Sequence, residues 1–261
     1  MKDERLILLD GPVNFRDLGG YVNQKGQIIK WHKVYRSDSL SNLSIQDQQK
    51  LTDLKITVDC DLRSKMERQA SPDIPLLNCT RINMPLYDEE NDEVESHFSL
   101  SNLWHKIPAI DDYLGSIYQR VLLNKHSQQM IQELFEQLLA LPEQEALVYH
   151  CSAGKDRTGI VTAVFLLALG VKEETIVQDY LLTNRLYDFA WQKQQPTADD
   201  LQKMISQMNT TRGEGVAIQA IAKTITAGWG SVNCFLAKEL HFSQTDLDDL
   251  QQLYLEAENE N

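Results

Sequence analysis

The stretch that decides the fold runs Ala146-Leu147-Val148-Tyr149-His150-Cys151-Ser152-Ala153-Gly154-Lys155-Asp156-Arg157-Thr158-Gly159. Its first residues are typical of a buried strand, and an apolar helical pattern continues from Thr158 to Leu169. Cys151 and Arg157 are six positions apart, so a tight loop between them can surround one tetrahedral oxyanion, with the sulfur below it and the guanidinium binding two oxygens. The stretch therefore predicts a strand, a loop and a helix that together hold an oxyanion against a thiol.

The loop has the composition of an anion-binding site. Its small residues allow successive backbone N–H groups to turn inward, and the positive end of the following helix adds to their field. The same field would stabilise the nucleophilic thiolate of Cys151. We also expect a hydroxyl of Thr158 or Ser152 to donate to the sulfur, and His150 to orient the loop rather than act as a base. The predicted phosphate-binding residues are Ser152, Ala153, Gly154, Lys155, Asp156 and Arg157.

Other interpretations of this stretch fit less well. A nucleotide-binding P-loop needs glycine where Tyr149 stands and serine or threonine where Asp156 stands. A zinc site is not favoured, because the four cysteines contain no closely spaced pair. A buried structural cysteine is the alternative to a catalytic one, since cysteine is among the most buried residue types.

The stretch resembles the signature loop of the cysteine-dependent protein tyrosine phosphatases, in particular a bacterial branch with Gly-Lys-Asp-Arg in the loop and dual or triple specificity. Further stretches resemble family blocks in family order, so the resemblance covers essentially the whole chain. These blocks are residues 14–20 (Asn-Phe-Arg-Asp-Leu-Gly-Gly), 34–38 (Val-Tyr-Arg-Ser-Asp), 61–64 (Asp-Leu-Arg-Ser) with Glu67, 179–184 (Asp-Tyr-Leu-Leu-Thr-Asn) and the tail from 230 to 250.

The resemblance implies hydrolysis of phosphate monoesters through a phosphocysteine. Cys151 would attack phosphorus, Arg157 would stabilise the equatorial oxygens, and an acid would protonate the leaving oxygen. The branch is thought to use the aspartate inside the loop, here Asp156, but the upstream candidates Asp88, Asp111 and Asp112 stay open. No metal or other cofactor is required.

The substrate class is left broad by the sequence. The expected partner is a phosphorylated protein or a phosphoinositide, because relatives with lysine at the position of Lys155 often accept phosphoinositides beside phosphotyrosine, and sometimes phosphoserine and phosphothreonine. Two other functions are alternatives: a phospho-ligand binding module without catalysis, and a sulfur transferase that also uses a cysteine loop.

Several residues outside the loop are candidates for supporting roles. Arg16 and Asp17 belong to a loop that the family keeps beside the active site, although a buried ion pair or a turn would explain them equally well. Asp61 and Arg63 end a strand that faces the same crevice, so either could contact substrate or brace the loop. Cys60 is either an ordinary core thiol or the partner of Cys151 in a protective disulfide.

Composition narrows the class of protein. The net charge of −13 argues against nucleic acid and anionic membrane surfaces as partners. No apolar run approaches the roughly 18 to 20 residues that span a bilayer, so we expect no stable membrane insertion. The unpaired-looking cysteines favour a cytoplasmic protein, with a secreted protein lacking a recognisable signal as the alternative. We expect a monomer, although the sequence does not determine the oligomeric state.

The order of predicted elements indicates an α/β fold. We expect a mainly parallel central sheet flanked by helices, with extra C-terminal helices, in a single catalytic domain over residues 1–261. Residues 87–126 would be either a lid insertion or helices that pack on the body. The predicted strands are 31–36, 56–62, 81–86 and 147–150, and the predicted helices are 44–54, 110–141, 158–169, 173–185, 198–208, 215–226, 232–239 and 245–256.

Overall fold

A computed structural model describes residues 4–87, 107–187 and 201–257 of the chain. The strands of its main sheet are β1 (Arg16–Asp17), β3 (Val34–Ser37), β4 (Ile56–Asp61), β5 (Thr80–Asn83) and β6 (Ala146–His150). They lie in the order β1-β3-β6-β4-β5; β1 pairs antiparallel to β3, and the other neighbours pair in parallel. The predicted α/β class with a mainly parallel sheet is confirmed.

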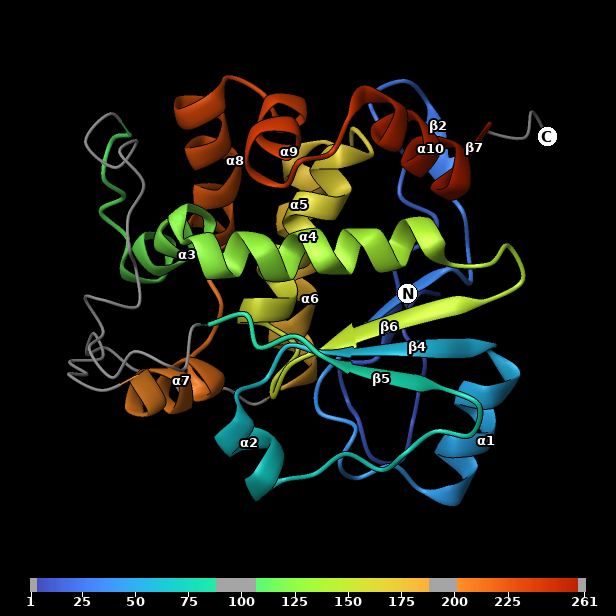
Figure 1. Ribbon diagram of the computed structural model, residues 1–261. Helices are drawn as coiled ribbons and strands as arrows, with labels where there is room; N and C mark the ends of the chain where they lie inside the picture. The colour runs from blue at the N-terminus through green and yellow to red at the C-terminus, as the bar shows by residue number, and fades with distance from the viewer. Residues whose placement is uncertain (1–3, 88–106, 188–200, 258–261) are drawn as a thin grey trace.

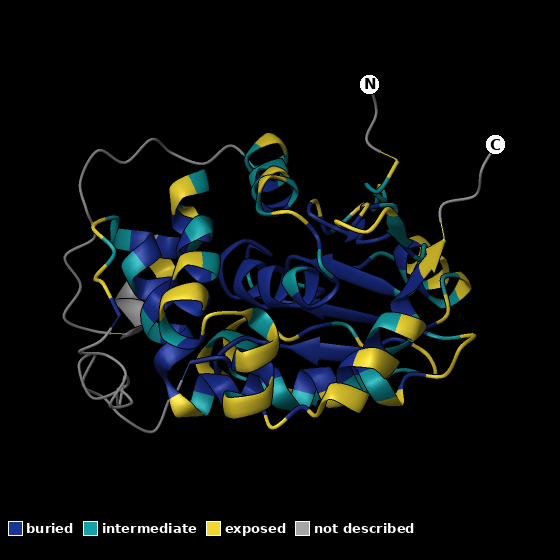
Figure 2. Cartoon of the chain, turned by 90° about the horizontal axis from the view of Figure 1, so that it is seen from above, coloured by how far each residue is buried: buried dark blue, intermediate teal, exposed yellow. Residues whose placement is uncertain are grey.

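Apolar clusters cover both faces of this sheet, so the central strands β3 and β6 are buried along their whole length. Tyr35 and Val148 pack with Leu51 of α1 on one face, while their neighbours Val34 and Leu147 join the larger cluster on the other. Figure 2 shows these central strands in the colour of buried residues. The helices are α1 (Ile45–Asp53), α2 (Lys65–Ala70), α3 (Tyr113–Leu123), α4 (Lys125–Ala140), α5 (Asp156–Ala168), α6 (Glu173–Leu186), α7 (Leu201–Thr210), α8 (Gly215–Trp229), α9 (Val232–Glu239) and α10 (Gln244–Tyr254).

Local capping chemistry explains several helix boundaries. Ser44 caps α1 as predicted, in a capping box with Asp47. The region predicted as one helix over 110–141 is two helices, because Asn124 leaves the helical conformation and its side chain caps α4. The last helix was predicted to reach Glu256 but ends at Tyr254. The chain then forms β7 (Leu255–Ala257), which pairs antiparallel with β2 (Gln27–Ile29), and neither strand was predicted.

The predicted lid can be followed only in part, because residues 88–106 lie outside the described residues. The remainder is packed on the body: Ile107, Leu114 and Tyr118 are buried in the main core, and α3 lies against α8. Residues 107–126 therefore include part of the packed body, and the lid stays a prediction.

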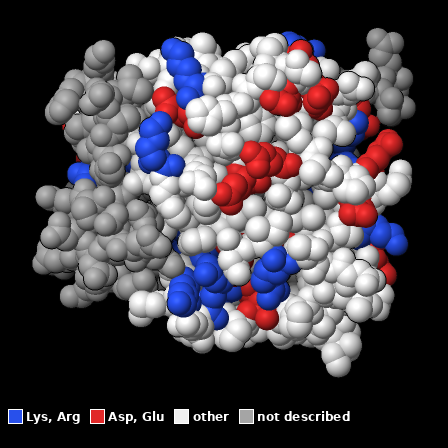
Figure 3. Space-filling view, in the orientation of Figure 1, with Lys and Arg blue, Asp and Glu red and all other residues white. Residues whose placement is uncertain are grey.

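The surface agrees with the acidic composition. Figure 3 shows acidic atoms gathered over α4 on the face toward the viewer. Within the described ranges, no helix combines the length and the apolar character that crossing a membrane requires.

Candidate active site

The loop after β6 lies at the carboxyl end of a central strand of the sheet, where parallel α/β folds place their ligands. Figure 1 shows α2 and α7 at this same end, toward which the β6 arrow points. Gly154 has φ +64°, and a Cβ there would lie 2.5 Å from the carbonyl oxygen of Ser37. Glycine is therefore required for both the turn and the close approach. The helix α5 begins at Asp156 instead of the predicted Thr158.

The backbone carbonyls of the loop are held from the outside. The Asn14 amide Nδ2 donates to the carbonyls of Ala153 at 2.9 Å and Gly154 at 3.1 Å. Arg36 donates to the same Gly154 carbonyl at 2.7 Å, and the Ser39 N–H donates to the Ser152 carbonyl at 3.1 Å. Because N–H and C=O groups of one peptide point in opposite directions, these bonds turn the following N–H groups toward the centre of the loop.

Asp179 on α6 anchors this outer shell. It forms ion pairs with Arg36 at 2.5 Å and with Arg16 at 3.0 Å, and it accepts a hydrogen bond from Tyr21 at 3.0 Å. Burial opposes its ionisation, but the two arginines hold the pKa of Asp179 well below its usual value. The predicted supporting residue Arg16 thus acts on the loop indirectly, through Asp179, which also holds Arg36. Asp17 accepts from the N–H groups of Gly19 and His32, so both residues follow the ion-pair and turn interpretation.

Arg157 is held by a residue that was not among the predicted site residues. Glu67, in the first turn of α2, accepts from Nη1 of Arg157 at 2.5 Å and from Nη2 at 2.7 Å. Burial alone would raise the pKa of Glu67, but Arg157 lowers it far below its usual value. Glu67 also closes a capping box with Ser64. The Ser-x-x-Glu spacing directly after β4 was the available signal for this helix.

Arg157 keeps donors for a ligand. The bidentate pair with Glu67 occupies one side of the planar guanidinium and leaves its other N–H groups for an oxyanion. Burial lowers the pKa of Arg157. The opposing effects of Glu67 and the Cys151 sulfur are larger, so the pKa rises above its usual value and the guanidinium stays charged. Both members of the expected pair, Cys151 and Arg157, are buried at this loop.

The hydroxyl groups of the loop do not have the expected partner. Ser152 donates to Glu67 at 2.5 Å. Thr158 Oγ1 is buried and has no hydrogen-bond partner among the described residues. Cys151 itself is buried and unpaired. Neither predicted hydroxyl bond to its sulfur is thus present.

The structure corrects the prediction for the Lys155 side chain. Its ammonium is buried and donates to the carbonyls of Met208, at 2.8 Å, and Thr211, near the C-terminal end of α7. Unpaired carbonyls and the helix dipole make that end attractive to a cation. The ammonium therefore fastens α7 to the loop instead of adding a cation to the phosphate pocket.

Asp156 is positioned by two tyrosines. Tyr118 on α3 donates to Asp156 Oδ1 at 2.5 Å, and the Tyr180 hydroxyl lies 2.8 Å from that of Tyr118. The other oxygen, Oδ2, is buried without a hydrogen-bond partner in the described part of the chain, with the Lys155 ammonium 3.5 Å away.

The upstream acid candidates have different positions. Asp112 caps α3 by accepting from the Gly115 N–H at 2.7 Å, and Asp111 is exposed. Asp88 lies outside the described residues. Asp156 is therefore the acid candidate that the structure positions within the loop.

A buried charge network lies behind the loop. Arg63 forms ion pairs with Asp61 and Asp73, and His150 Nε2 lies 3.1 Å from Asp59 and 3.4 Å from Asp73. Burial lowers the pKa of His150, but the carboxylates offset this effect and raise it to about 9. The neighbouring carboxylates therefore favour the protonated form of His150, which disfavours a role as a base. Asp61 and Arg63 pair with each other within this network, and their role in contacting substrate or bracing the loop stays a prediction.

The same network has the donor types of a metal site but is already neutralised. Asp59, Asp73 and His150 lie close enough together to share an ion. Asp59 is paired with Arg81 at 2.8 Å, however, and Asp73 is paired with Arg63. These guanidinium groups occupy the carboxylates that a cation would need.

Cys60 occupies a position in the core. It lies on β4 opposite Tyr149 of β6, is buried in the main apolar cluster, and is a free thiol. Burial raises the pKa of Cys60 well above its usual value, which disfavours the reactive thiolate. The core interpretation fits this environment.

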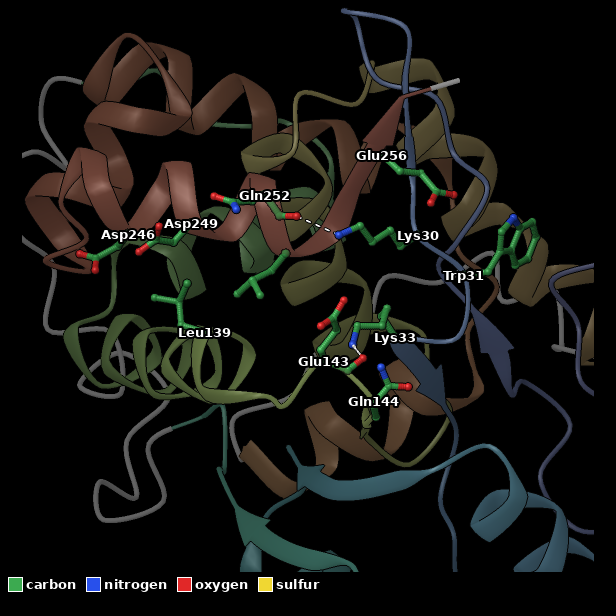
Figure 4. A pocket seen from close by; sticks show the side chains of 11 residues that line it. Lys30, Trp31, Lys33, Leu139, Glu143, Gln144, Asp246, Asp249, Gln252 and Glu256 are labelled. Carbon is green, nitrogen blue, oxygen red and sulfur yellow. Dashed lines mark hydrogen bonds between the residues drawn. The ribbon is translucent and has the colours of Figure 1, made fainter. Parts of the chain in front are cut away.

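A cavity lies away from the loop, at the amino end of the sheet strands. Its volume is about 1080 Å³, and its lining includes Lys30, Lys33 and Glu143 (Figure 4). Lys30 donates to the Gln252 carbonyl at 2.9 Å, and Lys33 donates to the carbonyls of Glu143 at 2.5 Å and Glu145 at 3.2 Å. None of the predicted site residues lines it.

Comparison with known proteins places this site in a family. Residues 7–256 match the sequence profile of the tyrosine phosphatase family. A candidate tyrosine-protein phosphatase of Cupriavidus necator is 27% identical over 265 residues, covering 95% of this chain and 88% of that protein. The triple specificity protein phosphatase PtpB of Mycobacterium tuberculosis is 29% identical over 195 residues, covering 67% of this chain and 68% of that protein.

The similarity to solved structures is weaker than the match to the family. The crystal structure of TpbA from P. aeruginosa shares 13% identity, covers 78% of this chain and 96% of that one, and has a TM-score of only 0.36. The sequence match spans nearly the whole chain and includes the loop of Cys151 and Arg157. The chain therefore belongs to the tyrosine phosphatase family and is a phosphatase.

Proposed function

We propose that this phosphatase hydrolyses phosphotyrosine in proteins by two in-line displacements through a phosphocysteine on Cys151. The observation that carries the proposal is the buried Arg157 guanidinium, paired with Glu67 at 2.5 and 2.7 Å and placed at the end of the loop that begins with Cys151. A guanidinium fixed in this way can bind two phosphoryl oxygens without first having to reorganise. The predicted single catalytic domain over residues 1–261 is part of this proposal.

In the first step the sulfur of Cys151 forms a bond to phosphorus while the ester P–O bond breaks. The electron pair goes to the leaving oxygen, which takes a proton from Asp156. Tyr118 donates to Oδ1 of Asp156, so Oδ2 is the oxygen left to carry that proton. The loop N–H groups and Arg157 stabilise the charge on the equatorial oxygens.

In the second step a water oxygen attacks phosphorus and the P–S bond breaks, which restores the thiolate. Asp156, ionised after the first step, accepts a proton from the water. The residues invoked in both steps lie in the loop or contact it. The proposal therefore needs no group beyond this chain and water.

Phosphotyrosine is the substrate class best supported. The expectation of phosphoinositide substrates relied on the Lys155 ammonium, which is bound to the carbonyls of Met208 and Thr211. The name of the M. tuberculosis relative describes a triple specificity. Phosphoserine, phosphothreonine and phosphoinositides are therefore the competing arms of the test.

The test is steady-state kinetics on para-nitrophenyl phosphate, matched phosphopeptides and soluble phosphoinositides, with a chelator present. We expect phosphotyrosine peptides to have the highest kcat/KM. Cys151→Ser should abolish turnover while inorganic phosphate still binds. Wild-type activity in that variant would contradict the mechanism, and phosphate binding without turnover in the wild type would support the binding-module alternative.

A further inference from the structure

Tyr87 is a buried side chain that the mechanism above does not use. It follows β5 at the carboxyl end of the sheet, and its residue surface is only 5% exposed. Its hydroxyl is fully buried and has no hydrogen-bond partner among the residues that the structure describes. A buried hydroxyl without a partner is costly, so such a group in a folded protein calls for an explanation.

The position of Tyr87 suggests an explanation for its unpartnered hydroxyl. The guanidinium carbon of Arg157 lies 5.4 Å from the centroid of the Tyr87 ring, within the range of a cation–π contact. Burial raises the pKa of Tyr87; Arg157 opposes this effect, and Asp156, Cys151 and Glu67 add to it. The ring of Tyr87 therefore lies beside Arg157. Its phenol stays protonated at neutral pH, when it can donate a hydrogen bond.

A second unpartnered buried hydroxyl belongs to the start of α5. Thr158 Oγ1 shares the condition of the Tyr87 hydroxyl within the described ranges. Thr158 follows Arg157 in the first turn of α5, and Tyr87 contacts Arg157. A buried, unsatisfied hydroxyl on a side chain that contacts the arginine of a predicted oxyanion site is typical of a site whose missing partner is the ligand.

We propose that the Tyr87 hydroxyl donates a hydrogen bond to an oxygen of the phosphoryl group bound in the loop, which makes Tyr87 a substrate-binding residue. The inference rests on the proposed function, because it takes the loop to bind a phosphoryl group. The ring of Tyr87 packs against Arg157 with or without ligand. The hydroxyl gains its partner only when the site is filled.

The test measures binding apart from turnover. Inorganic phosphate is titrated by calorimetry into Cys151→Ser and into the same variant carrying Tyr87→Phe, which keeps the ring and removes the hydroxyl. We expect the phosphate Kd to rise about tenfold, the scale of one hydrogen bond to a charged group. In the otherwise wild-type enzyme, Tyr87→Phe should raise KM for para-nitrophenyl phosphate more than it lowers kcat.

A matched control separates this role from a structural one. Tyr254 is also a buried tyrosine, but its hydroxyl donates to the Leu138 carbonyl at 2.7 Å, and it contacts none of the loop residues described above. Tyr254→Phe should lower the Tm and leave phosphate binding unchanged. Tyr87→Phe should weaken phosphate binding and leave the Tm no lower than that of its parent. The reason is that it removes a hydroxyl that has no partner among the described residues of the ligand-free protein.

Two results would overturn the proposal: a phosphate Kd within twofold of the parent, or a fall in Tm as large as that of Tyr254→Phe. Neither result touches the proposed function, which requires only that the wild type turns over phosphate esters. A wild type that binds phosphate without turnover would remove the proposed function and leave the role of Tyr87 intact. A protein that binds no phosphate at all would contradict both.

Discussion

Replacing Glu67 by glutamine should test how Arg157 is held. The change keeps a side-chain acceptor for the cap of α2 but removes the negative charge from a pair in which Arg157 is only 2% exposed. Breaking a buried ion pair by removing one partner costs about 3 to 5 kcal/mol. Because glutamine retains one acceptor oxygen, we expect the lower end of that range, about 3 kcal/mol, which in a chain of this size lowers the Tm by about 6 to 12 °C.

The assay is thermal unfolding with and without inorganic phosphate. A bound phosphate supplies a new counter-charge to Arg157, so the variant should bind phosphate more tightly, and the same phosphate concentration should raise the Tm of Glu67→Gln more than that of the wild type. Glu136→Gln is the control, because Glu136 is an exposed partner of Gln132 on α4 and its loss should leave the Tm nearly unchanged. A Tm for Glu67→Gln within about 1 °C of the wild type would refute the reasoning.

The stabilisation by the Glu67–Arg157 pair should decrease as the pH falls. The pKa of Glu67 in the folded protein lies well below its usual value of about 4.3. The stabilisation by the pair is therefore fully present above that usual value and is lost as the pH falls toward the folded pKa. The difference in Tm between wild type and Glu67→Gln should accordingly be constant near neutral pH and narrow on acidification.

Two further predictions concern the proposed chemistry. Arg157→Lys should lose at least about 2 kcal/mol of transition-state stabilisation in kcat/KM, because a planar fork is replaced by a point charge, and a rate within a few fold of wild type would count against it. Asp156→Asn should lose most activity toward alkyl phosphates and much less toward aryl phosphates with acidic leaving groups, and should flatten the basic limb of the kcat/KM profile. Equal losses across leaving groups would instead indicate that Asp156 braces the loop.

The sequence was sufficient for those parts of the fold that depend on local patterns. Alternating strands and helices predicted the parallel sheet, and Ser44 marked the start of α1 as observed. The local sequence pattern gave wrong element boundaries where a single residue ends a helix or where a distant segment pairs with a strand. Asn124 interrupts a continuous helical periodicity, and β7 exists only because β2, more than 200 residues earlier in the chain, offers it an antiparallel partner.

By itself the sequence predicted Cys151 and Arg157 as the candidate reactive pair, because their spacing and the small residues between them are local properties of one loop. It could not determine where long side chains go. Lys155 was expected to face the phosphate, but the carbonyls at the end of α7 bind its ammonium. Only tertiary structure brings Glu67, Asn14 and Arg36 to the loop, since a buried charge or carbonyl takes whichever partner the packing of distant elements supplies.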